Sequence, residues 1–338
     1  MKRTKKKIIG ALCIAAVVVI GGVVYTYSKN TNNPIKSSET SVTIDVNKGE
    51  AFYTLLDRLK SEGILRSEFM TKLYLKINGV SPKVIPGTYT IDSDTSLKEL
   101  LTRLQTEDNL KVTIPEGYDI SEIGNKLQEA GLFTKDEFIK AVENYKLPSF
   151  IKEVPGRRYQ LEGYLFPDTY SIPKGSSPDY VIQTMLKRFK AEIDALEKQD
   201  GVTLNAEEID KLVTKASIIE NEARVDKERP IIASVINNRL KTNMPLQIDA
   251  TVIYALGKHV DVVTYKDLKV DSKYNTYKNK GLPIGPISNP GKKSLEAALK
   301  PASTDYLYYI LVPGTNEHKF TKSGNEFNEF RKKYGYDD

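Results

Sequence analysis

The chain opens with an uncharged, largely apolar run from Ile8 to Tyr25, preceded by a cluster of cations. The run holds eighteen residues, which as a helix span about 27 Å and so just cross the hydrocarbon core of a bilayer. This pattern predicts a single-pass membrane anchor over residues 8–27, with residues 1–7 in the cytoplasm and everything after the anchor outside. A cleaved signal peptide is the alternative, although Thr26-Tyr27-Ser28 matches a cleavage site only loosely. The five cations are Lys2, Arg3, Lys5, Lys6 and Lys7.

Residues 28–40 are polar and show no apolar period, which predicts a short flexible stalk. Beyond the stalk, one series of patterns occurs twice: a short strand, two amphipathic helices, a second strand and a third helix. Val42-Thr43-Ile44 recurs as Val112-Thr113-Ile114, each at the start of a copy. Gly63 and Gly131 occupy matching places, where each would end the first helix of its copy.

We therefore predict two related small units, residues 41–108 and residues 109–195, with the second also linking to the region that follows. Their order of elements resembles the LysM class of glycan-binding modules. Two helix pairs that look alike by chance, or a plain spacer, are the alternatives, because the order of elements does not establish a function.

A further helix is predicted from residue 206, because Asn205-Ala-Glu-Glu208 forms a capping-box start. At about 100° per residue, Glu220 falls within the apolar arc of this helix, whereas Glu222 falls on the other side and should be solvated. A carboxyl among apolar groups has a raised pKa, which suits a general acid. Alternatively, Arg224 forms an ordinary helical ion pair with Glu220. The apolar arc is defined by Ile209, Leu212, Val213, Ala216 and Ala223.

The last part of the chain predicts a hairpin, with strands at Tyr306–Val312 and His318–Phe320, and an amphipathic helix at Ser323–Tyr334. In this hairpin we expect His318 to be a surface residue. Taken together, the patterns predict an α+β fold in which strands of residues 196–338 form a mostly antiparallel sheet beside the Glu220 helix.

Composition removes several classes of function. The net charge of +6 comes from residues 1–40, because the remainder holds 43 basic and 43 acidic residues. The excess of basic residues thus indicates how the chain is oriented in the membrane, and nucleic-acid binding is not expected. The lone Cys13 lies in the predicted anchor, and His259 and His318 have no partner motif, so we expect neither disulfides nor a metal. No nucleotide-binding or metalloprotease motif is present either, and no cofactor is expected.

Five segments, in order, resemble the endolytic murein transglycosylases of the YceG-like family, which also have one N-terminal membrane anchor. The likeness covers essentially the whole region after the stalk. One departure is Ala250, where the family often has proline. The segments are LEGYLFPDTY (Leu161–Tyr170), KASIIENEA (Lys215–Ala223), SVINNRL (Ser234–Leu240), LQIDATVIYALG (Leu246–Gly257) and YNTYKNKGLPIGPISNPG (Tyr274–Gly291).

The resemblance implies that residues 196–338 form a catalytic domain with Glu220 as the catalytic residue. It also implies cleavage of the MurNAc–GlcNAc β-1,4 bond in nascent peptidoglycan strands, leaving 1,6-anhydroMurNAc ends. The implied partners are the glycan strands and the cell-wall synthases of the elongation and division machinery. Two alternatives stay open: a non-catalytic glycan-binding scaffold, and a hydrolase that uses Glu220 with Asp249 as two carboxylates.

Substrate-binding residues are expected in two further segments. Asp249, with Gln247 and Thr251 at strand spacing, is expected to face one cleft. Asn275, Thr276 and Tyr277 lie in a Gly- and Pro-rich loop and carry groups that bond sugar hydroxyls. In both segments the alternative is structural, because such side chains often satisfy the backbone of their own loop. Tyr254, Tyr265, Tyr274 and Tyr277 are likewise either sugar-ring platforms or packing residues, and Arg239 is either a helix cap or a functional residue.

Overall fold

The computed structural model describes residues 21–37, 41–105, 109–258, 260 and 262–336. Most of the expected anchor at residues 8–27, and the tail before it, therefore lies outside the described residues. Residues 21–32 are helical. No helix within the described ranges combines the length and the apolar character that crossing a membrane requires.

The described chain divides into two compact units. The N-terminal unit holds the described residues up to Lys111 together with Ser171–Ser176, and the C-terminal unit holds Val112–Tyr170 and the chain from Ser177 onward. The expected boundary between residues 195 and 196 falls inside a helix, α7 (Pro178–Asp200). The C-terminal unit therefore joins most of the second predicted small unit to the region expected to be catalytic.

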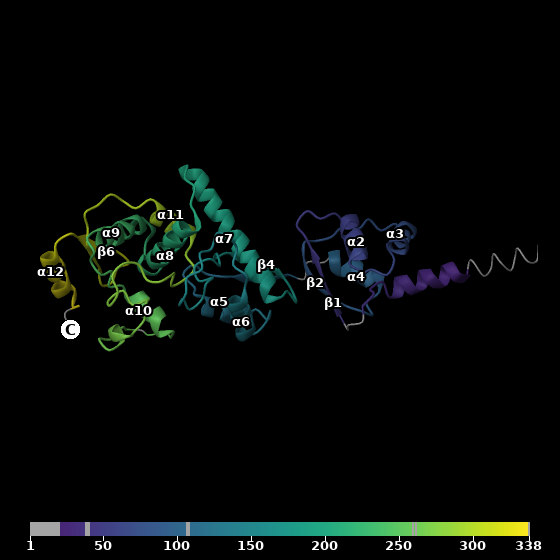
Figure 1. Ribbon diagram of the computed structural model, residues 1–338, viewed down its shortest axis with the longest axis horizontal. Helices are drawn as coiled ribbons and strands as arrows, with labels where there is room; N and C mark the ends of the chain where they lie inside the picture. The colour runs from purple at the N-terminus through teal and green to yellow at the C-terminus, as the bar shows by residue number, and fades with distance from the viewer. Residues whose placement is uncertain (1–20, 38–40, 106–108, 259, 261, 337–338) are drawn as a thin grey trace, which may run out of the picture. The chain divides into compact units, whose positions relative to one another are not determined.

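Between Ser41 and Gln105, the N-terminal unit combines a two-stranded sheet, β1 with β2, and the helices α2, α3 and α4 (Figure 1). Strand β1 pairs with β2 antiparallel, in a register that runs from Ser41 opposite Asp92 to Val46 opposite Gly87. Helix α2 forms because Phe52, Leu55, Leu56 and Leu59 recur at three- and four-residue steps, and all four are buried. The bounds are β1 (Ser41–Val46), α2 (Phe52–Ser61), α3 (Glu68–Ile77), β2 (Gly87–Asp92) and α4 (Leu97–Gln105).

The segment expected to be a flexible stalk contributes to this unit. Ile35 is 1% exposed and belongs to the core formed by the helices and strands. It forms an isolated antiparallel bridge with Leu65, and the Arg66 guanidinium donates to the carbonyl oxygens of Asn33 and Ile35. A single buried isoleucine thus holds this end of the polar segment in place. The prediction of a flexible stalk missed it because one apolar residue has no periodicity.

The predicted order of elements occurs twice along the chain. The order β1–α2–α3–β2–α4 recurs as β3–α5–α6–β4–α7, and Gly63 and Gly131 have φ angles of +75° and +76° directly after the first helix of each copy. Strands β3 and β4 form their own two-stranded sheet. The bounds of the second copy are β3 (Asn109–Thr113), α5 (Ile120–Glu129), α6 (Lys135–Asn144), β4 (Thr169–Pro173) and α7.

Helix α8 lies at the centre of the C-terminal unit and packs against α9, α10 and α11 (Figure 1). The predicted capping box is confirmed, because Asn205 accepts from the backbone of Glu208 while the Glu208 side chain accepts from the backbone of Asn205. The helix is buried on several sides and not along a single apolar arc, because Asp210, Thr214 and Ser217 are buried together with the apolar residues. The helices are α8 (Ala206–Glu222), α9 (Arg229–Lys241), α10 (Asp249–Leu256) and α11 (Lys292–Leu299), with 3-10 turns η1 (Asp226–Glu228) and η2 (Asp267–Lys269).

The hairpin and the closing helix of the C-terminal unit are confirmed. Strands β5 (Tyr308–Leu311) and β6 (His318–Thr321) pair antiparallel, and α12 (Gly324–Tyr334) starts with Ser323 as its N-cap. In the described part of residues 196–338, these two strands are the only ones. The fold is therefore α+β with antiparallel pairing, as predicted, but most of the regular secondary structure of this region is helical.

Candidate active site

Glu220 lies in the last turn of α8, and its carboxylate is held from two sides. Its side chain is only 6% exposed. Oε1 accepts from Arg229 Nη1 at 2.9 Å, and Oε2 accepts from the Gly291 backbone N–H at 2.9 Å. Arg224, the expected ion-pair partner, is exposed and forms no ion pair with Glu220 within the described part of the chain. The ion pair exists, but it is formed by the first residue of α9, which immobilises the Glu220 carboxylate.

Arg229 is itself fixed by two further groups. The same Nη1 donates to Ser294 Oγ at 2.5 Å, and Nε donates to Asp226 Oδ1 at 3.3 Å. Lys293 also pairs with Asp226. Three segments that are distant in sequence, the end of α8, the start of α9 and the start of α11, thus converge on one carboxylate.

Two glycines allow the chain to approach Glu220 closely. Gly117 has a φ of +82°, and a Cβ there would lie 3.6 Å from Glu220 Cγ. A Cβ on Gly291 would lie 1.9 Å from Glu116 Oε1, so any side chain at Gly291 would displace the Glu116 carboxyl. The two glycine loops are also joined by backbone bonds, because Gly117 donates to Asn289 and Asn289 donates to Tyr118. Glu116 therefore lies against the peptide that binds Glu220.

Glu116 is the second carboxyl beside Glu220, and no sequence pattern pointed to it. Partial burial, and after it the negative charge of Glu220, raise the pKa of Glu116, while Arg229 and Lys293 oppose the shift. The sequence feature that could have pointed to Glu116 is the Pro-Glu-Gly turn after strand β3. More than a hundred residues separate this turn from Glu220, so no spacing connects the two carboxyls. The pair has the composition of an acid–base site, two carboxyls in unlike surroundings.

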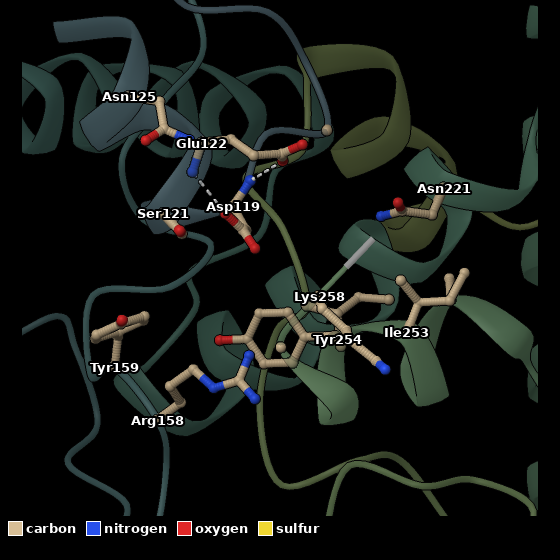
Figure 2. Close-up of a pocket in the computed structure, with 14 residues that line it drawn as sticks. Asp119, Ser121, Glu122, Asn125, Arg158, Tyr159, Asn221, Ile253, Tyr254 and Lys258 are labelled. Atoms are coloured by element: carbon tan, nitrogen blue, oxygen red, sulfur yellow. Dashed lines mark hydrogen bonds between the residues drawn. The ribbon is translucent and has the colours of Figure 1, made fainter. Parts of the chain in front are cut away.

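A cleft of about 760 Å³ adjoins this site (Figure 2). Gly117, Asn221 and Ile287 belong to its lining and connect it to the end of α8. Figure 2 shows Asp119, Ser121, Glu122 and Asn125 of the α5 segment on one side, and Arg158 and Tyr159 lower in the view. Helix α10 and the residues after it supply the remaining wall. A cleft of this volume is in the range that holds small ligands.

Glu162 forms a buried polar centre that ties the walls of the cleft together. It is 1% exposed and accepts from the Ile120 N–H at 3.2 Å, the Tyr254 hydroxyl at 2.9 Å and Asn289 Nδ2 at 3.0 Å. Burial raises its pKa from 4.5 to about 8. These three donors belong to α5, to α10 and to the loop before Gly291, so one side chain positions all three walls.

Glu222 was expected to be solvated, and this prediction is wrong. Its Oε2 accepts from the Tyr309 hydroxyl at 2.7 Å, and burial raises its pKa. The reason is that α8 is enclosed on several sides, so the face opposite Glu220 also meets protein. His318 was expected on the surface, but its side chain is 6% exposed and its Nδ1 lies 2.7 Å from Glu228 Oε2.

The predicted strand spacing at residues 247–251 is also wrong, because Asp249 begins helix α10. Gln247 is exposed with a φ of +51°, and Asp249 accepts from the Tyr277 hydroxyl at 2.5 Å. Thr251 is fully buried and bonds Thr276 Oγ1 at 2.9 Å. The three side chains of this segment therefore do not line up on one face.

Asn275 and Thr276, in the loop at residues 275–277, bond the backbone of neighbouring segments. Asn275 is 0% exposed, and its Nδ2 donates to the carbonyl oxygens of Leu268 and Val270. Thr276 is 1% exposed and accepts from the Ile248 N–H at 3.0 Å. Asn275 and Thr276 thus shape the loop, as does Thr251, while Gln247, Asp249 and Tyr277 are the predicted substrate residues that reach solvent or partial exposure.

The remaining candidates from the sequence are Arg239 and the tyrosines. Arg239 is buried and has a structural role, although not as a helix cap, because it donates to the carbonyl oxygens of Leu307 and Leu246 outside α9. Tyr254 lines the cleft and packs edge-to-face on Tyr274, whereas Tyr265 is exposed. Across the described ranges, no group of three or more His, Cys, Asp or Glu residues is arranged to hold a metal ion.

Comparisons with known proteins agree with this picture. The model of the YceG-like family matches residues 44–333. The endolytic murein transglycosylase of Bacillus subtilis (strain 168) is 36% identical over 334 residues, which cover 94% of this chain and 91% of that protein. The endolytic murein transglycosylase of Streptococcus pneumoniae is 29% identical over 90% of this chain, which spans only 61% of that longer protein.

A solved structure shows the same relationship. The crystal structure of a YceG-like protein from Listeria monocytogenes has a TM-score of 0.58 and 32% sequence identity to this chain, covering 87% of it and all of the Listeria chain. The matched region of the family model includes every residue placed around Glu220 and the cleft. The chain therefore belongs to the YceG-like family.

Proposed function

We propose that this protein is a lytic transglycosylase that cuts peptidoglycan strands internally, at the MurNAc–GlcNAc β-1,4 bond, and leaves 1,6-anhydroMurNAc ends. The relatives named endolytic murein transglycosylases support the reaction class. The observation that carries the proposal is Glu220, a buried carboxylate fixed between Arg229 and Gly291 beside a cleft of about 760 Å³.

In the proposed reaction Glu220 acts twice. As an acid it gives its proton to the glycosidic oxygen while the bond from that oxygen to C1 of MurNAc breaks. As a carboxylate it then takes the proton of the C6 hydroxyl of the same MurNAc, whose oxygen closes on C1. The proton is returned, no water is consumed, and one carboxyl suffices, whereas a hydrolase usually needs two.

The surrounding residues support the first half of this cycle, in which Glu220 gives up its proton. The Arg229 guanidinium and the Gly291 N–H both bond the ionised carboxylate, so they stabilise it after it has given up its proton. They also keep it from rotating out of line, which is the usual task of groups around a catalytic acid. Gln247, Asp249 and Tyr277 are proposed to contact substrate at the end of the site nearest α10.

The proposal extends to location and partners. The cationic N-terminus and the apolar run at residues 8–27 favour a single-pass anchor, with the catalytic unit outside the cell membrane. There the enzyme would meet nascent strands beside the cell-wall synthases. The antiparallel β1–β2 pair with α2 and α3 has the order of elements that resembles LysM modules, and for the N-terminal unit we propose either glycan binding or a spacer role.

Product analysis tests the reaction directly. The full-length chain in detergent is incubated with uncross-linked glycan strands, and mass spectrometry identifies the new ends. We expect ends that are lighter by one water, and none with Glu220→Gln. Ordinary reducing ends would show a hydrolase instead, and the absence of cleavage by the unaltered protein would contradict an enzymatic function.

A further inference from the structure

Two cations line the cleft at a distance from Glu220. Arg158 and Lys258 both belong to its lining, and both are exposed. In Figure 2, Arg158 lies low on the left and Asn221, the neighbour of Glu220, lies high on the right, across the open space of the cleft. The part of the cleft near Arg158 therefore differs in charge from the part near α5, where Asp119 and Glu122 lie.

The Arg158 guanidinium is held in a fixed position, and it forms no ion pair with an acidic residue of the described ranges. It lies 4.6 Å from the centroid of the Tyr254 ring, and its Nη2 donates to the Ala255 carbonyl at 3.1 Å. Gly257 leaves room for it, because a Cβ at that position would lie 3.2 Å from Nη2. A long side chain that is already ordered loses little entropy when it binds a ligand.

The support beneath Arg158 is rigid as well. The Tyr254 hydroxyl donates to the buried Glu162 at 2.9 Å, and the Tyr254 ring packs edge-to-face on Tyr274 with centroids 4.8 Å apart. The Arg158 backbone N–H donates to the Tyr274 hydroxyl at 3.3 Å. The side chain of Arg158 thus rests on Tyr254 and its backbone is bonded to Tyr274, and the Tyr254 side chain is in turn fixed by the buried Glu162.

Most of the donors of this basic pair remain available to a ligand. A guanidinium carries five N–H groups, and Nη2–Ala255 is the one side-chain hydrogen bond of Arg158 with the described residues. Lys258 forms no ion pair with any residue in the described ranges. A guanidinium and an ammonium group that line the same cleft are suited to binding carboxylates.

We propose that Arg158 and Lys258 form a subsite for a carboxylate of the stem peptide on the glycan strand. The inference rests on the proposed function, because the strand is then the ligand of the cleft. In a peptide-bearing strand the lactyl carboxyl of MurNAc is tied up in an amide, so the negative charge of the strand lies on the stem. A sugar bound at Glu220 would direct its stem along the cleft to Arg158, and the enzyme would prefer peptide-bearing strands.

Binding is measured first, in the full-length Glu220→Gln variant, so that no cleavage is needed. Three fluorescently labelled strands are compared: one with free stem carboxylates, one with these carboxylates converted to amides, and one stripped of its stems by an amidase. We expect Arg158→Gln and Lys258→Gln each to raise Kd for the first strand about tenfold or more, and to leave the other two nearly unchanged. Lys241→Gln, an exposed cation on α9 outside the cleft, is the matched control and should change nothing.

Several outcomes overturn the assignment. Equal Kd values for the free and amidated strands would do so, and so would an equal loss with the stripped strand, whose only carboxylates are lactyl groups. Lys258→Gln keeps the test valid if Arg158→Gln proves unstable, because Lys258 makes no ion pair or hydrogen bond with the described residues. If the unaltered enzyme produces no anhydro ends while the Kd differences appear, the subsite stands and the proposed function fails.

Discussion

Arg229, the first residue of α9, donates a hydrogen bond of 2.9 Å to Glu220 in the last turn of α8. Both side chains are largely buried, at 11% and 6% exposure. A buried charge that loses its partner is costly, because the remaining ion is shielded from water without compensation. The pair therefore couples the stability of the C-terminal unit to the geometry of its candidate catalytic group.

We expect Arg229→Gln to reduce cleavage by about a hundredfold or more, since the product carboxylate of Glu220 loses its main counter-charge. We also expect a loss of about 3 kcal/mol in the free energy of unfolding. Strand-cleavage assays and urea denaturation measure the two effects. The matched control is Arg224→Gln. Arg224 is exposed and lies four residues after Glu220, the spacing at which the sequence predicted the ion pair. Equal behaviour of the two variants would show that the ion pair has no role.

Gly291→Ala tests the close approach of Glu116. Gly291 has a φ of −77°, which alanine adopts without strain, so the effect comes from the added methyl group alone. That group would fall 1.9 Å from Glu116 Oε1, and the peptide that binds Glu220 must move. We expect at least a tenfold loss of kcat with about 1–3 kcal/mol of destabilisation.

The double variant Gly291→Ala/Glu116→Ala removes the clash and serves as the control for this substitution. It should restore most of the stability that Gly291→Ala loses. A thermal melt that shows no recovery would mean that the methyl group meets something other than Glu116.

Local structure was largely predictable from the sequence, because its causes lie within a few residues of each element. The capping box at Asn205, the hairpin before α12 and the repeated order of elements all follow from neighbouring side chains and turns. Glu220 was likewise singled out by its position on α8. The family resemblance then added a role that periodicity alone left open.

What failed depends on packing between distant segments. Glu222 was expected in solvent because one helix was considered by itself, yet Tyr309 covers it from a strand 87 residues later. The partner of Glu220 was sought four residues ahead, at Arg224, but it lies nine residues ahead, at Arg229. Glu116 and Glu162 join the site only through the fold, since no spacing relates them to α8.

Glu116→Gln tests the second carboxyl. Because burial and the nearby Glu220 charge raise the pKa of Glu116, its neutral form persists to a higher pH than is usual for glutamate. As pH rises through the raised pKa, Glu116 ionises and places a second negative charge beside Glu220. We expect kcat/KM of the unaltered enzyme to fall on this alkaline side, and that of Glu116→Gln to fall less steeply over the same range. Superimposable pH profiles would exclude Glu116 from the reaction.

The buried Glu162 predicts how stability depends on pH. Its pKa rises from 4.5 to about 8 on folding, so between these values the folded state binds more protons than the unfolded state. Its contribution is therefore complete below pH 4.5 and is lost as pH rises through about 8, by at most about 1.4 kcal/mol per pH unit. Urea denaturation from pH 5 to pH 8.5 measures this slope. Glu162→Gln has no proton to lose, so we expect its stability to fall less steeply over the same range. A slope unchanged by the substitution would show that Glu162 is ionised in the folded protein at neutral pH.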